Sequence, residues 1–191
     1  MQSPIKTLSK GSRGTSRQLI LTALLGALAL GVHAAEAQIP LLFPGVKPGF
    51  ANAVSLAALV LLGWKSALGI MLLRICISFL LGGNIFAFAC SLGGGLASLG
   101  VTAFLYRRLH HLLSLPGISI AGALTHNLAQ IAVVAFLMRT SRIFLYLPVL
   151  FFTGILSGLC VGILTSLLCK RLQRLGISFS GENDCSPQDS L

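Results

Sequence analysis

Eight polar or charged side chains stand inside or beside strongly apolar runs, where each of them needs a partner or water. Lys47, Arg74 and His126 bring positive charge to this set, which contains a single carboxylate. A solute with an anionic or strongly hydrogen-bonding group would supply the missing partner. We interpret the eight as ligand-binding residues and assign no catalytic residue, metal or cofactor: Glu36, Lys47, Asn52, Arg74, Asn84, His126, Asn127 and Gln130.

The densest group lies in the apolar run 117–138. His126 and Gln130 are one helical turn apart on one face with Gly122 below them, and Asn127 lies beside that face. Hydrogen bonds between helices would account for one or two such groups. Three together favour a site that faces inward, toward a ligand.

Arg74 stands in the interior of the run 66–83. Snorkelling to the interface is the competing account, but Arg74 lies well beyond Lys65 along the helix. Glu36 is the only acidic residue before the C-terminal tail, and His33, three residues earlier on the same helix, is a candidate partner for it. We expect Arg74 to have a functional role in the membrane.

The segment 44–53 is broken by proline and glycine and carries Lys47 and Asn52. Irregular backbone at membrane depth is tolerated where it is packed in protein or lines a watery cavity. Two interpretations stay open: a segment that faces the ligand at the edge of its site, or an external loop whose Lys47 meets lipid headgroups. Further along, Gly93 to Gly95 stand in mid-run, where we expect close packing or local unwinding.

The composition is that of a polytopic membrane protein. Of 191 residues, 55% are hydrophobic and 9% charged, and basic residues flank the apolar runs as the positive-inside rule predicts. The net charge of +10 therefore reflects topology, and we exclude nucleic acid as a partner. The five cysteines form no CxxC pair, so neither a disulfide framework nor a zinc site is indicated. Adjacent His110 and His111 do not face one another on a helix.

Charge counting predicts six transmembrane helices. With six spans, 10 basic residues fall on the side of both termini and 3 on the other, so both termini are expected in the cytoplasm. We predict a basic cytoplasmic segment over residues 1–17, a membrane domain over 18–172 and a polar, disordered tail over 173–191. The first span contains an Ala-x-Ala site but is expected to be retained.

The first span also carries a stripe of small residues, Ala23, Ala27 and Gly31. Such stripes let another helix approach closely in lipid. An internal packing seam and the docking of another subunit are both compatible with this spacing.

Four ordered motifs between residues 18 and 172 carry a resemblance: PGVKPGFANAVSLAAL, RICISFLLGG, FACSLGGGLAS and GISIAGALTHNLAQ. They resemble the Gx transporter family, also labelled heptaprenyl diphosphate synthase component I. Pro48 departs from the apolar residue expected after the lysine. This family in turn is similar to the S components of energy-coupling-factor transporters, six-helix proteins that capture a solute from outside. The resemblance implies that Ala23, Ala27 and Gly31 dock on a transmembrane coupling subunit, which works with ATPase subunits.

The label "synthase" can be tested by looking for the residues that this chemistry needs. Prenyl diphosphate synthases hold magnesium on aspartate-rich motifs, and the sequence has no such motif and no Walker motif. We therefore expect a non-enzymatic binder in a bacterial cytoplasmic membrane. Two classes remain: a solute-capture subunit of a transporter, and an accessory membrane subunit linked to isoprenoid or quinone biosynthesis or to flavin-linked electron transfer.

Overall fold

The computed structural model describes residues 9–37, 51–82, 84–109, 111–140 and 142–174. Within these ranges the side chains of residues 9–18, 36, 37, 51–53, 172 and 173 are not described. The described residues form six α-helices, one 3-10 helix and no strand. The elements are α1 Ser9–Ala37, α2 Ala51–Leu62, α3 Trp64–Leu80, α4 Ile85–Leu109, α5 Leu115–Met138, η1 Arg142–Tyr146 and α6 Leu147–Arg174.

Local sequence signals account for the helix boundaries. Gly63 separates α2 from α3 with φ of 86°, a left-handed backbone that favours glycine. Asn84 caps α4 by accepting a hydrogen bond of 2.6 Å from the Ala87 N–H. Ser114 caps α5 and is followed by a proline near the helix start. These breaks agree to within a few residues with the bounds of the apolar runs 66–83 and 117–138.

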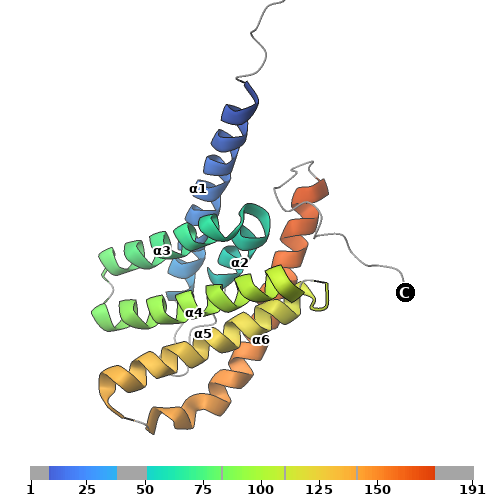
Figure 1. The fold of residues 1–191 in the computed structure, drawn as a ribbon. Coiled ribbons are helices and arrows are strands. Elements are labelled where there is room, and N and C mark those ends of the chain that lie inside the picture. The colour runs from blue at the N-terminus through green and yellow to red at the C-terminus, as the bar shows by residue number, and fades with distance from the viewer. Residues whose placement is uncertain (1–8, 38–50, 83, 110, 141, 175–191) are drawn as a thin grey trace, which may run out of the picture.

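Figure 1 shows α3, α4 and α5 running side by side, with α6 crossing beside α5 and α2 lying behind. Helix α1 packs against α2 and α3, and its N-terminal end projects beyond the other helices (Figure 1). Residues of α1, α2, α3, α4, α5 and α6 all contribute to the main apolar cluster. The bundle therefore has one shared interior, and α2, whose residues 54–61 are all buried, lies within it.

Glycines let α4, α5 and α6 approach one another closely. A Cβ on Gly158 of α6 would lie 2.7 Å from the Ile120 Cα of α5, a distance that a real side chain does not tolerate. A Cβ on Gly93 would lie 2.7 Å from a methyl group of Val133. Helix α4 continues without interruption through Gly93 to Gly95, so close packing explains these glycines and local unwinding does not occur.

Much of the bundle surface is apolar. Large hydrophobic side chains are exposed on α1, α3, α4, α5 and α6, among them Leu24, Leu80, Phe104, Phe136 and Phe152. Three helical segments are long and apolar enough to cross a membrane: Ile85–Leu109, Leu115–Met138 and Arg142–Arg171. Exposed apolar faces of this extent suit lipid contact, so the described residues indicate a membrane protein.

The other three helices have apolar segments that are shorter than those three. The apolar part of α1, Leu19–Ala35, and helix α3 each have 17 residues, and α2 has 12. A helix of 12 residues is about 18 Å long, shorter than the hydrocarbon core of about 30 Å. The number of helices matches the prediction, whereas the six-span topology and its orientation stay predictions. Helix α1 begins at Ser9, before the apolar run.

Candidate functional site

A polar cavity surrounds Arg74 at the α3–α4 junction. Its volume is about 40 Å³, and its lining comes from α1, α3, the residue before α4, and α4. We call it the Arg74 cavity, lined by His33, Arg74, Ile75, Ser78, Phe79, Asn84, Ala87, Phe88 and Ser91. Arg74 is only 6% exposed, so this guanidinium is buried within the bundle as the sequence predicts and does not snorkel.

Two contacts shape this cavity. The His33 Nε2 and Ser78 Oγ atoms are 2.8 Å apart and share a hydrogen bond that joins α1 to α3. The rings of Phe79 and Phe88 pack with centroids 5.1 Å apart, within the range of favourable aromatic pairs. The Arg74 cavity thus combines a buried cation and small polar groups with an aromatic wall. His33 is bonded to Ser78, and its expected pairing with Glu36 stays a prediction, because the side chain of Glu36 lies outside the described residues.

A second cavity of about 40 Å³ lies between α2, α4, α5 and α6. We call it the hydroxyl cavity, because five hydroxyl side chains line it together with the imidazole of His126 and the amide of Asn127. Those five are Ser55, Ser98, Thr102, Ser119 and Ser157. A volume of about 40 Å³ has room for about three water molecules.

Helix α4 joins the two cavities. Asn84, just before this helix, and Ser91 line the Arg74 cavity, and Ser98 and Thr102 line the hydroxyl cavity. Their spacing places them on one face of α4. The two cavities are therefore consecutive parts of one polar stripe through the bundle.

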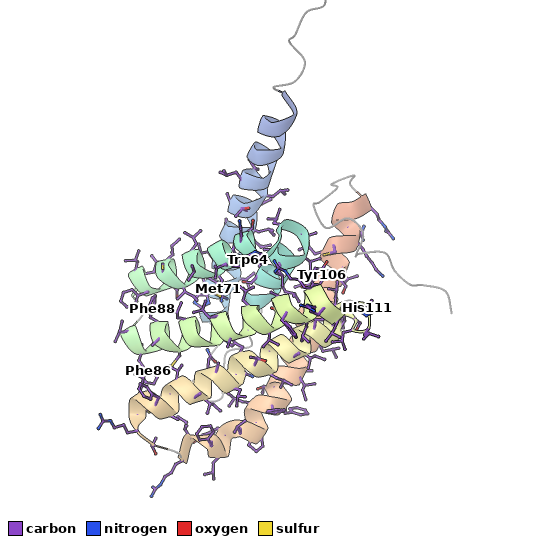
Figure 2. All side chains as sticks on the ribbon, viewed as in Figure 1. Trp64, Met71, Phe86, Phe88, Tyr106 and His111 are labelled. Atoms are coloured by element: carbon purple, nitrogen blue, oxygen red, sulfur yellow. The ribbon has the colours of Figure 1, made fainter. Side chains whose placement is uncertain are left out.

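The glycines of α4 set this geometry. A Cβ on Gly94 would lie 2.9 Å from the His126 Nδ1 and 2.8 Å from the Gln130 Cγ. A Cβ on Gly95 would lie 2.8 Å from the Met71 Sδ of α3, and Figure 2 shows Met71 between α3 and α4. Any larger residue at Gly94 would displace the imidazole from its position between α4 and α5.

The predicted site residues divide between these two places. Arg74 and Asn84 lie in the Arg74 cavity, and His126 and Asn127 line the hydroxyl cavity. Gln130 lies beside His126 against Gly94. Lys47 lies outside the described residues, as do the side chains of Glu36 and Asn52.

Two of these residues also have clear structural roles. The side chain of Asn84 caps α4. The Nδ2 atom of Asn127 donates a hydrogen bond of 2.9 Å to the Leu150 carbonyl oxygen of α6. This is the interhelical bonding that the sequence left open as the alternative for one or two of the three polar groups on α5.

The small residues of α1 face outward. Ala23, Ala27 and Gly31 are exposed, and a Cβ added at Gly31 would meet no atom within 4 Å. The buried face of α1 is formed by Leu25 and Ala29 instead. The stripe is thus not a packing seam among the described residues of this chain, and docking of another subunit stays a prediction.

Sequence reasoning missed the hydroxyl side chains. Ser55, Ser119 and Ser157 come from three different helices, and no local pattern marks them as neighbours. One signal was present, since Asn84, Ser91 and Ser98 recur every seven residues along an otherwise apolar run. This period places them on one helical face. No group of three metal-ligating side chains occurs among the described residues.

The apolar surface and the buried polar cavities define a helical membrane protein with an interior suited to binding a small polar group. A model of the family heptaprenyl diphosphate synthase component I matches residues 25–168. This match covers most of the chain, so the protein belongs to that family. The comparisons with curated proteins and with solved structures give no significant match.

Proposed function

We propose that this protein is a non-catalytic, multi-pass subunit of the bacterial cytoplasmic membrane that captures a small anionic solute from outside. The observation that carries the proposal is Arg74, 6% exposed, in a cavity lined with further polar groups. A buried guanidinium offers a planar fork of donors that matches a carboxylate or phosphate. Glu36 is the only acidic residue in the sequence before residue 182.

The shape of the Arg74 cavity supports a solute with an apolar or aromatic part. Phe79 and Phe88 form one wall, and an aromatic wall contributes binding energy beside the charged contact. A volume of about 40 Å³ is far below the roughly 300–1,000 Å³ of small-molecule pockets. Capture therefore requires α1, α3 and α4 to separate, and the segment that carries Lys47 follows α1 directly.

The resemblance to energy-coupling-factor S components extends this proposal to a transporter. The exposed small-residue stripe of α1 supports it, since Ala23, Ala27 and Gly31 leave room for another helix. The partner would be a transmembrane coupling subunit with ATPase subunits. Both termini would lie in the cytoplasm.

The family name favours a second candidate. "Component I" implies a partner component of a synthase, and a prenyl diphosphate would be an anion with an apolar body. In this role the protein would be an accessory membrane subunit that assembles with a prenyl diphosphate synthase. A pull-down from native membranes separates the candidates: ATPases and a coupling subunit support the first, and prenyl or redox enzymes support the second.

The anion proposal is tested by binding of inorganic phosphate and acetate to purified protein. Arg74→Ala should weaken phosphate binding about 10- to 100-fold, the size of a lost charge-assisted hydrogen bond, and Arg74→Lys should retain part of it. Arg107→Ala, which removes an exposed arginine, is the matched control. Thermal unfolding of each variant checks that it is folded. Full phosphate binding by folded Arg74→Ala protein would refute the proposal.

A further inference from the structure

The hydroxyl cavity contains a buried hydroxyl group without a partner. Ser55 of α2 is 8% exposed, and its Oγ has no hydrogen-bond partner among the described residues. The imidazole of His126 also lines this cavity and has a hydrogen bond to the backbone of Gly94. A buried polar group without a hydrogen bond costs about 1–3 kcal/mol, so the Ser55 hydroxyl calls for a ligand or water in the cavity that it lines.

The other polar groups that line the cavity determine which hydrogen bonds a ligand has to make. Thr102 donates its hydroxyl proton to the Ser98 carbonyl at 2.8 Å, and Ser157 donates to the Gly154 carbonyl at 3.3 Å. Their oxygens still have lone pairs that accept hydrogen bonds. A matching ligand group therefore has to donate a hydrogen bond, as a hydroxyl or an amide does.

Charge narrows the ligand class further. The described lining residues include no carboxylate, lysine or arginine, so neither a cation nor an anion finds a counter-charge in the wall. The buried guanidinium of Arg74 in the neighbouring cavity would also repel a cation. A hydrocarbon group would leave the Ser55 hydroxyl unsatisfied.

We infer that the hydroxyl cavity between α2, α4, α5 and α6 is a binding site for an uncharged, hydrogen-bond-donating group, a hydroxyl or an amide, held between Ser55 and His126. Because both cavities are lined by the same face of α4, the neutral group would belong to the same solute whose anionic group binds at Arg74. That link to Arg74 rests on the proposed function. The neutral site itself rests on the lining of its own cavity.

The experiment uses small probes of similar size that differ in charge: acetamide and ethylene glycol as neutral donors, acetate as anion and guanidinium as cation. The full-length protein is labelled with ¹⁵N-histidine, and His126→Gln assigns the His126 ring signals. Acetamide and ethylene glycol should shift these signals saturably. Acetate and guanidinium should bind at least about tenfold more weakly, since each would desolvate a charge without compensation.

Ser55→Ala removes the hydroxyl group with little change in volume. It should weaken acetamide binding about fivefold, the size of one neutral hydrogen bond. Ser166→Ala is the matched control, because Ser166 bonds the Gly162 carbonyl of its own helix and does not line the cavity. Equal binding by Ser55→Ala and wild-type protein would overturn the inference, as would stronger binding of guanidinium or acetate. Signals that no probe shifts would mean that water alone fills the cavity, and this also overturns it.

The same titrations separate this inference from the proposed function. Acetamide binding by a protein that does not bind phosphate would refute the anion proposal and leave the neutral site standing. Phosphate binding that depends on Arg74, without acetamide binding, would refute the neutral site alone.

Discussion

Gly94 offers the sharpest test of how α4 positions the site. A Cβ at this position would lie 2.9 Å from the His126 Nδ1 and 2.8 Å from the Gln130 Cγ. Overpacking of this kind costs about 1–3 kcal/mol, while replacing glycine by alanine in a helix contributes about 0.5–1 kcal/mol of stability. Gly94→Ala should therefore destabilise the protein by up to about 2.5 kcal/mol, the difference of these two effects.

Gly100 on the same helix provides the matched control. A Cβ there would meet no atom within 4 Å, so Gly100→Ala keeps only the helix-forming gain of about 0.5–1 kcal/mol. The difference between the two variants isolates the contact at Gly94. It should be about 1–3 kcal/mol, or about 2–12 °C in unfolding midpoint for a protein of this size.

The assay is the fraction of monodisperse protein that remains after heating, measured by size-exclusion chromatography in detergent. A second readout is specific to the site: the ¹⁵N signals of His126 should move in Gly94→Ala and stay unchanged in Gly100→Ala. Equal midpoints for the two variants, or an unchanged His126 signal in Gly94→Ala, would show that α4 and α5 do not approach at Gly94 as described.

Three further predictions address topology, docking and helix capping. Reporter fusions at the C-terminus and after Ser114 should both report the cytoplasm, because basic residues favour that side; an external signal at either refutes the six-span topology. Ala27→Trp should prevent co-purification of the partner while leaving the protein folded, since the added ring fills the space that close helix approach needs; wild-type levels of partner would refute docking. Asn84→Ala should lower stability by about 0.5–2 kcal/mol through loss of the α4 cap, and Asn84→Ser should retain most of it; equal unfolding midpoints for these two variants would contradict the capping role.

Several basic residues lie near one end of the bundle. Figure 2 shows Trp64, Tyr106 and His111 at one end of the bundle and Phe86 and Phe88 at the other. The ends of α2, α4, α5 and α6 meet at the first of these, around Ala57, Tyr106, Leu115 and Cys169. Lys65, Arg107 and Lys170 are exposed close by along the chain. The reporter fusions test whether this end faces the cytoplasm.

The sequence by itself determined the helices and the chemical character of the interior. The apolar runs 66–83 and 117–138 predicted α3 and α5 to within a few residues at each end, because a helix end depends on the backbone of a few residues, as at Gly63, Gly82 and Ser114. The burial of Arg74 was also predictable, because a cation in the middle of an apolar helix has to lie in the protein interior or near water.

Only the tertiary structure decided which side chains share a cavity. Ser55 and His126 are brought together by packing between α2, α4 and α5, and no spacing along one helix encodes that. The same holds for the exposed side of α1: small residues at every fourth position fit an inner or an outer face equally well. The hydrogen-bond partner of Asn127 was also decided by the tertiary structure, because its bond to Leu150 depends on how closely Gly154 lets α6 approach α5. Contacts between distant segments depend on the packing of whole helices, and this is why local patterns predicted the polar residues but not their partners.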